Sequence, residues 1–152
     1  MPEAQKDLLI QWFDEVWNKK RREAIDELLP EECVIHDAGG STTGPEEFKP
    51  FFDRMHGALS DLQITLHNVV SDGAYACARW SASMRHTGDG LGIPATGKTA
   101  TISGITMARF ANGRFVEAWQ NWDMLGLLDQ LQAEDAAVEH TAQLHKLASA
   151  VE

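Results

Sequence analysis

The hydrophobic pattern of this chain changes its period near Asp61, and that change constrains the fold more than any other feature. Before it, apolar residues recur at steps of three and four, as in Leu9, Phe13 and Val16, which is typical of amphipathic helices. After it, Leu62 and Ile64 alternate with polar partners, as in half-buried antiparallel strands. Helices followed by strands predict an α+β fold. A strongly curved antiparallel sheet wrapped around the N-terminal helices would leave a cone-shaped cavity for a small apolar ligand.

The first half of the chain is expected to be mainly helical. Segment 6–29 predicts two helices joined by a basic corner. A short strand at 33–36 and a loop at 37–44 follow, the latter because of its glycine, serine and threonine content. A third helix begins at Pro45, and Pro50, which lacks a backbone donor, predicts a kink or a late start.

The second half is expected to be mainly strands. Alternation predicts strands at 74–86, 99–110 and 115–122, and the glycine-rich segment 87–98 predicts a loop. An amphipathic helix begins at Met124 and ends the domain.

The charge balance of this 152-residue chain limits its partners. It has 13 basic and 23 acidic residues, and the resulting net charge of −10 repels phosphate backbones and anionic lipids. No apolar run reaches the roughly 20 residues of a membrane span, and the polar start is unlike a signal peptide. We therefore expect a cytoplasmic protein that binds neither nucleic acid nor membrane.

Cysteine and histidine patterns predict no metal site. Cys33 and Cys77 make no metal or redox motif and are expected to be buried free thiols in a reducing compartment. His140 and His145 are too far apart in sequence to place two ligands on one helical face. The loop at 87–98 lacks a phosphate-binding pattern.

The turn between the last two strands decides which residues face the cavity. A two-residue turn at 112–113 would put Asp123 and Arg109 on opposite faces. A three-residue loop at 111–113, with Gly113 at positive φ, would shift the register by one and group polar side chains as a pocket requires. We favour this longer loop. The pocket face would then carry Ser103, Met107, Arg109, Glu117, Trp119, Asn121 and Asp123.

Several segments resemble a known family. The sequence is similar to the SnoaL-like polyketide cyclases of the nuclear transport factor 2-like superfamily, whose fold is a cone-shaped α+β fold. The resemblance is carried by Gly92-Ile93-Pro94-Ala95-Thr96-Gly97-Lys98, by residues 109–119 (RFANGRFVEAW) and 121–131 (NWDMLGLLDQL), and less specifically by Trp17-Asn18 and Val34-Ile35-His36-Asp37. It covers about residues 5–131. It implies a SnoaL-like domain at 1–131 and a C-terminal helical extension at 132–152.

The resemblance implies a metal-free and cofactor-free intramolecular aldol condensation, with one aspartate near the end of the last strand as acid/base. Asp123 occupies that position, and its indole-rich flank suits a general base. Aspartate there could instead cap the helix that begins at Met124. His36 is a second catalytic candidate or a structural histidine. Arg109 would stabilise an enolate, or pair with Glu117 across the hairpin.

Large side chains supply the candidate ligand-binding surface, with plain core packing as the alternative role. The substrate-binding candidates are Trp17, Phe52, Met55, Trp80, Met84, Met107, Trp119 and Asn121. The expected partner is a small apolar or polycyclic ligand. The alternative hypotheses are a ketosteroid-isomerase-like enzyme, an epoxide hydrolase and a non-catalytic small-molecule-binding dimer module. In an epoxide hydrolase, only Glu117 or Asp37 could supply the second carboxylate.

A homodimer is also expected. In the favoured register, the sheet face away from the cavity would be apolar and would need covering. That face would carry Ile102, Thr106, Phe110, Val116 and Trp122. The tail's narrow stripe of Val138, Leu144 and Leu147 would need a surface to dock on.

Overall fold

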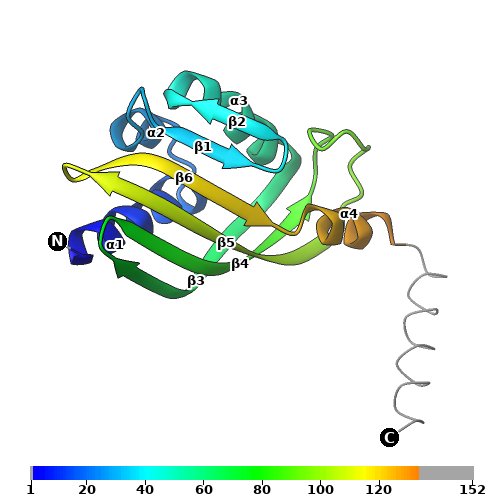
Figure 1. Cartoon of the computed structure of the whole chain (residues 1–152). Coiled ribbons are helices and arrows are strands. Elements are labelled where there is room, and N and C mark those ends of the chain that lie inside the picture. The colour runs from blue at the N-terminus through cyan, green and yellow to red at the C-terminus, as the bar shows by residue number, and fades with distance from the viewer. Residues whose placement is uncertain (1, 134–152) are drawn as a thin grey trace, which may run out of the picture.

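The predicted α+β class is confirmed by a computed structural model, which describes residues 2–133 (Figure 1). The predicted tail stripe lies outside the described residues. In chain order the elements are α1 (Pro2–Trp12), η1 (Phe13–Asn18), α2 (Glu23–Leu28), β1 (Val34–Asp37), β2 (Gly40–Thr43), α3 (Gly44–Ala58), β3 (Leu59–Asp72), β4 (Tyr75–His86), β5 (Thr99–Ala111), β6 (Arg114–Trp122) and α4 (Met124–Gln132).

The strands form one six-stranded sheet in the order β2-β1-β6-β5-β4-β3. Most neighbours are antiparallel, but β1 runs parallel to β6, with Ile35 opposite Ala118. The predicted antiparallel sheet is therefore confirmed for most strand pairs, and the β1–β6 pair is the exception. Strand β1 pairs with the edge of β6 that β5 does not occupy. The two strands can run parallel because a long segment of chain connects β1 to β6.

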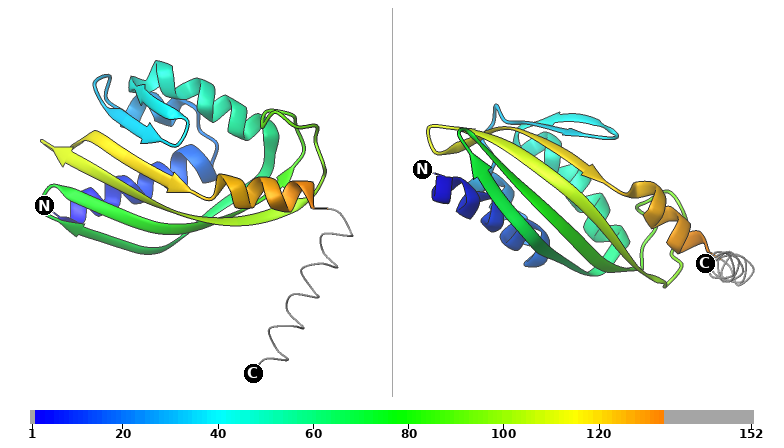
Figure 2. Two further views of the ribbon diagram at one scale, coloured as in Figure 1. Left: turned by 45° about the vertical axis from the view of Figure 1, so that its right-hand side comes forward. Right: turned by 60° about the horizontal axis from the view of Figure 1, so that its bottom comes forward.

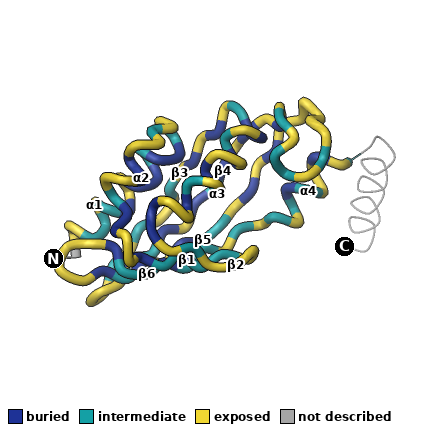
Figure 3. The backbone as a smooth tube through the Cα atoms, turned by 90° about the horizontal axis from the view of Figure 1, so that it is seen from above, coloured by how far each residue is buried: buried dark blue, intermediate teal, exposed yellow. Residues whose placement is uncertain are grey.

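The helices within residues 2–133 cover one face of the curved sheet (Figure 2). Aromatic rings join the two layers: Trp12 lies 5.2 Å from Phe48 and 6.1 Å from Phe115, measured between ring centroids. Phe13 and Trp80 are likewise 6.1 Å apart. Along β4 and β5, buried positions alternate with more exposed ones, as expected for strands with one covered face (Figure 3).

The first helix continues into a π-helical turn, η1, that the sequence pattern did not predict. The Lys19 amide donates to the Asp14 carbonyl across five residues, at 2.8 Å. Asn18 then fastens the turn to β3, because its side chain donates to the Ile64 carbonyl (3.0 Å) and accepts from the Ile64 amide (2.7 Å). Such single π-turns are often found at functional sites, and this one carries Trp17 toward the cavity described below.

The segment predicted as a loop at 37–44 is mostly a hairpin. Strand β2 pairs with β1, with Thr42 opposite Ile35, so the loop prediction was wrong. Serine and threonine composition suggested a loop, but a neighbouring strand supplies the pairing that composition alone does not reveal. Helix α3 follows at Gly44 and includes Pro50, so the predicted late start was also wrong.

The turn between β5 and β6 has two residues, and the predicted three-residue loop was wrong. Ala111 pairs with Arg114, leaving Asn112 at φ 53° and Gly113 at φ 74°. Two successive positive φ values are those of the hairpin turn that Asn-Gly favours. The prediction of positive φ at Gly113 is confirmed.

A bulge at Val116 changes the register just after this turn. Phe110 pairs with Phe115, but Arg109 pairs with Glu117, so Val116 is the extra residue on β6. The bulge places Arg109 and Glu117 on the same face of the sheet, as the longer loop would also have done.

The two sheet faces are nevertheless the reverse of the prediction. Ile102, Thr106 and Phe110 are buried against the helices, and Trp122 lines the inner cavity. The expected apolar outer face therefore does not consist of these residues. The outward positions of β5 and β6 instead carry Ser103, Met107, Arg109, Glu117, Trp119 and Asn121, because strand alternation places these on the other side.

Candidate functional site

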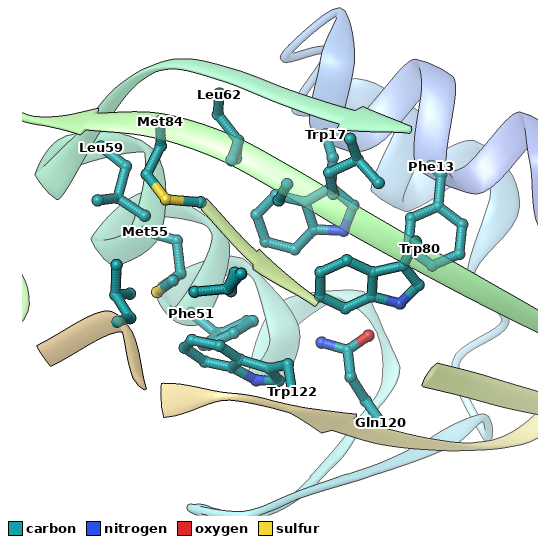
Figure 4. Close-up of a pocket in the computed structure, with 14 residues that line it drawn as sticks. Phe13, Trp17, Phe51, Met55, Leu59, Leu62, Trp80, Met84, Gln120 and Trp122 are labelled. Atoms are coloured by element: carbon teal, nitrogen blue, oxygen red, sulfur yellow. The ribbon is translucent and has the colours of Figure 1, made fainter. Parts of the chain in front are cut away.

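A small, almost wholly apolar inner cavity lies between the sheet and the helices. Its volume is about 50 Å³. Figure 4 shows the Gln120 side chain projecting into it near the indoles of Trp80 and Trp122. The lining consists of Phe13, Trp17, Phe51, Met55, Leu59, Leu62, Ile64, Trp80, Ala82, Met84, Ile102, Gln120, Trp122 and Leu127.

Gln120 is the one side-chain amide in this lining, and a short polar chain orients it. The Trp80 indole N–H donates to Thr106 Oγ1 at 3.1 Å, and the Thr106 hydroxyl donates to Gln120 Oε1 at 3.4 Å. The Gln120 side-chain oxygen therefore already accepts a hydrogen bond. Its NH₂ group is the part of the amide left to meet a polar atom of a ligand.

A larger cleft of about 540 Å³ opens over the inner cavity. That volume lies within the roughly 300–1,000 Å³ of ordinary small-molecule sites. Phe51, Met55 and Trp122 line both spaces, so they form the boundary between them. The cleft lining consists of Ile35, Asp37, Ala38, Gly39, Gly40, Ser41, Thr42, Phe48, Phe51, Arg54, Met55, Gly90, Leu91, Gly92, Trp122 and Met124.

Asp37 is the carboxylate of this cleft. The Trp122 indole N–H donates to Asp37 Oδ1 at 3.2 Å and lies 3.4 Å from Oδ2, and the Ala38 amide donates to Oδ1 at 2.7 Å. These bonds fix the carboxylate at the end of β1, beside the boundary residue Trp122. Because most of them go to Oδ1, Oδ2 keeps the capacity to accept a proton from a ligand.

Asp123 does not face the cavity, and the prediction that it does was wrong. It is exposed, and its Oδ1 accepts from the Gly126 amide at 2.9 Å, so it is the N-cap of α4. A Cβ at residue 126 would clash with this carboxylate, which explains the glycine there. Capping, the alternative role for this aspartate, is the one that the geometry supports.

His36 and Arg109 also lie outside the cavity, on the outer sheet face. His36 Nε2 is 2.6 Å from Glu117 Oε2, its Nδ1 is 2.8 Å from Ser41 Oγ, and Arg109 Nη2 donates to Glu117 Oε1 at 3.4 Å. The hydrogen bond from His36 is the main reason that the pKa of Glu117 is lowered. The pairing of Arg109 with Glu117, weighed against an enolate-binding role, is confirmed.

The other candidate residues divide between the inside and the outside. Trp17, Met55, Trp80 and Met84 line the inner cavity as expected. Phe52 is buried but packs against Trp17 and His56 rather than lining the cavity. Met107, Trp119 and Asn121 were wrongly placed. They lie on the outer face, where Trp119 stacks on His36 with ring centroids 5.7 Å apart.

Arg54, Gln120 and Trp122 are functional candidates that sequence reasoning did not place in the site, and Asp37 was considered only as the second carboxylate of an epoxide hydrolase. Strand alternation carries a signal for two of them: Asp37 follows His36 and Gln120 follows Trp119, so each must face away from its neighbour. Placing Arg54 depends on how the loop at 87–98 packs over α3, and no local pattern encodes that packing.

Residues 2–133 contain two further groups of interest, the thiols of Cys33 and Cys77. Cys33 and Cys77 are free, as predicted, but only Cys33 is fully buried, and burial raises the pKa of its thiol to about 11. Within these residues no three His, Cys, Asp or Glu side chains gather as a metal site. No helix in this part of the chain is long and apolar enough to cross a membrane.

A six-stranded curved sheet with helices over one face and an apolar cavity between the two layers defines a class of α+β folds. The chain belongs to the SnoaL-like polyketide cyclase family, whose model matches residues 7–131. The predicted family is thereby confirmed. No curated protein has a sequence that matches this chain significantly.

Solved structures agree with this assignment. A putative SnoaL-like polyketide cyclase from Jannaschia sp. CCS1 superposes with a TM-score of 0.79 at 19% identity, covering 88% of this chain and 94% of its own. TsrD from Streptomyces laurentii gives 0.76 at 28% identity, covering 87% and 97%. A putative polyketide cyclase from Acidithiobacillus ferrooxidans also gives 0.76 at 28% identity, covering 85% and 94%.

Proposed function

We propose that this protein is an enzyme that binds a small polycyclic carbonyl compound in the cleft and removes a proton next to the carbonyl group, with Asp37 as general base. The observation that carries the proposal is the position of Asp37. Among the cleft-lining residues it is the only carboxylate, and Trp122 and the Ala38 amide hold it beside the apolar boundary. Family membership favours cyclisation as the reaction.

The chemistry needs one carboxylate and no added reagent. Asp37 takes a proton from a carbon flanked by carbonyl groups, and the C–H electron pair becomes the enolate. The enolate carbon then attacks a second carbonyl carbon of the same molecule, forming the ring bond and an alkoxide. The alkoxide takes the proton back from Asp37, so the base is regenerated. Holding both ends of one chain in a folded conformation supplies much of the rate.

The shape of the two spaces supports a ligand with a flat apolar body. The cleft has the volume for such a molecule, and Phe51, Met55 and Trp122 present an apolar floor. The Gln120 amide below this floor could donate to an oxygen that reaches the inner cavity. Developing negative charge on such an oxygen is stabilised by fixed donors in a site that excludes water.

Proton exchange tests the proposal without knowledge of the natural substrate. In D₂O, the protein should accelerate deuterium uptake at the carbon next to the carbonyl of 2-tetralone, measured by proton NMR above the buffer rate. Asp37→Asn should reduce this acceleration by about 10²-fold, the low end for a positioned acid/base group. Asp123→Asn, the matched control, should retain it.

The two variants also decide between the two aspartates. A protein in which Asp123→Asn loses the acceleration and Asp37→Asn keeps it would return the acid/base role to the position that the family resemblance implies. A wild-type protein that binds 2-tetralone without accelerating exchange would favour the non-catalytic binding module. An epoxide hydrolase finds less support, because Glu117, the other carboxylate considered for it, is paired on the outer face.

We also propose that the chain forms a cytoplasmic homodimer through its outer sheet face. The residues that support this differ from those first expected. Met107 and Ile105 are 38% and 50% exposed, and Val70 and Tyr75 on the neighbouring strands are 60% and 41% exposed. Sedimentation equilibrium at micromolar concentration should give the mass of two chains. Ile105→Lys should give the mass of one, while a wild-type monomer would refute the pairing.

A further inference from the structure

The cleft contains one charged group that makes no hydrogen bond or ion pair with any described residue. Its two charged lining residues are Asp37 and Arg54. Asp37 has hydrogen-bond donors from Trp122 and Ala38. Arg54 has no hydrogen bond or ion pair with any described residue. Its guanidinium lies over the face of the Phe51 ring, with 5.5 Å between the guanidinium carbon and the ring centroid.

Most arginines in the described part of the chain are paired, which makes Arg54 unusual. Arg21, Arg22, Arg79, Arg85 and Arg109 all donate to a side-chain or backbone oxygen. Arg114, at the turn between β5 and β6, also has no such partner among the described residues. Arg114 does not line the cleft, so Arg54 is the one described cation there.

The surroundings of Arg54 keep its guanidinium beside the ligand space. The loop at residues 88–92 packs its backbone against α3, and a Cβ at Gly90 would lie 2.6 Å from the Arg54 carbonyl oxygen and 3.3 Å from Arg54 Cγ. Glycine at position 90 lets the loop approach this closely, so that Gly90, Leu91 and Gly92 line the cleft beside Arg54. Phe51, over which the guanidinium stacks, lines both the cleft and the inner cavity.

We propose that Arg54 binds a carboxylate group on the ligand, so that this protein acts on apolar ring compounds that carry an acid group. This inference rests on the proposed use of the cleft and names the substrate class of that site. A guanidinium presents paired N–H donors that match the two oxygens of a carboxylate. The chain's net charge of −10 repels anions in general, so a ligand anion needs a specific cation where it binds.

Two probes that differ only in charge test the inference. 2-Naphthoate carries the carboxylate, and 2-naphthamide replaces it with a neutral group of the same shape. In calorimetric titrations the wild-type protein should bind 2-naphthoate more tightly. Arg54→Gln should weaken 2-naphthoate by about fivefold or more, as expected for a partly exposed charged pair, and leave 2-naphthamide unchanged. Arg54→Lys, which keeps the charge but not the paired donors, should fall between.

Arg114→Gln is the matched control, because it removes the same charge away from the cleft and should leave both affinities unchanged. Equal loss in Arg114→Gln would show a general charge effect and would overturn the inference. So would an Arg54→Gln variant that binds 2-naphthoate as the wild type does. These affinities do not depend on catalysis, so failure of Asp37 as the base would leave a positive result for Arg54 intact. Failure of both probes to bind would refute the cleft as the ligand site.

Discussion

The two faces of the β5–β6 hairpin are built from neighbouring residues but have opposite characters. The inward face contributes Ile102, Gln120 and Trp122 to an apolar cavity. The outward face joins Arg109, Glu117 and His36 in a network in which each charge already has a partner. Polar residues that converge on one sheet face therefore do not by themselves define a pocket. A paired network satisfies its own hydrogen-bonding capacity, whereas a site keeps a group such as Asp37 or Arg54 available for a ligand.

Two isoleucines on β5 provide the sharpest test of this contrast in stability. Ile102 is 7% exposed on the inward face, and Ile105 is 50% exposed on the outward face. Ile102→Ala should lower the free energy of unfolding by about 2–5 kcal/mol, since it leaves a cavity in the core. Ile105→Ala should cost less than about 1 kcal/mol at a protein concentration low enough to keep the chain monomeric. Urea unfolding at one protein concentration measures both, and equal losses would contradict the assignment of faces.

The cap at the start of α4 should have a smaller effect. Asp123→Ala removes the acceptor for the Gly126 amide and should lower the free energy of unfolding by about 1 kcal/mol. Asp123→Asn, which can still accept that bond, should lose only a fraction of this. Thermal unfolding of the three proteins gives the comparison. An Asp123→Ala variant as stable as the wild type would mean that this aspartate is not needed as a cap.

The smallest expected difference between the two faces is in how the free energy of unfolding depends on pH. Burial is the main cause that lowers the pKa of His56, which packs against Trp17 and Phe52 on the helix side. A lowered histidine pKa means that the unfolded state binds the proton first, so stability should fall as the pH drops below about 6.5. Glu117, also with a lowered pKa, contributes stability that is lost only when the pH falls below about 4.5.

Substitutions assign the two steps of this pH dependence. Urea midpoints at pH 7.5, 5.5 and 4 should show that His56→Leu flattens the change between the first two values. Glu117→Gln should flatten the change between the last two. A profile that His56→Leu leaves as steep as before would remove the buried imidazole from the account.

The sequence predicted most of the helices and strands in their order, and several cavity-lining residues, because these depend on local periodicity. Trp17, Met55, Trp80 and Met84 lie on apolar stripes that any compact fold must bury. The orientation of the hairpin was less accessible. The bulge at Val116 lies three residues past Gly113, and nothing in the residue types distinguishes it from a longer loop.

The site was harder to predict, since it depends on contacts between distant segments. Asp123 has a residue type that suits both a helix cap and a general base, and only the position of the Gly126 amide decides between them. Asp37 becomes a site residue because Trp122, which is 85 positions away in the chain, donates to it. Strand alternation did place Asp37 on the side opposite His36, and a closer use of that parity would have identified it.

The most direct test of the central claim, that ligands occupy the inward side of this sheet, uses the five tryptophans as reporters. Their indole N–H signals in a ¹⁵N-labelled protein would be followed during titration with 2-tetralone, with Trp122→Phe and Trp119→Phe assigning the two decisive peaks. Trp122 lines both the cleft and the inner cavity, and Trp119 lies on the outer face. The account predicts that the Trp122 signal shifts and saturates while the Trp119 signal stays in place. A shift of Trp119 with Trp122 unmoved would contradict it.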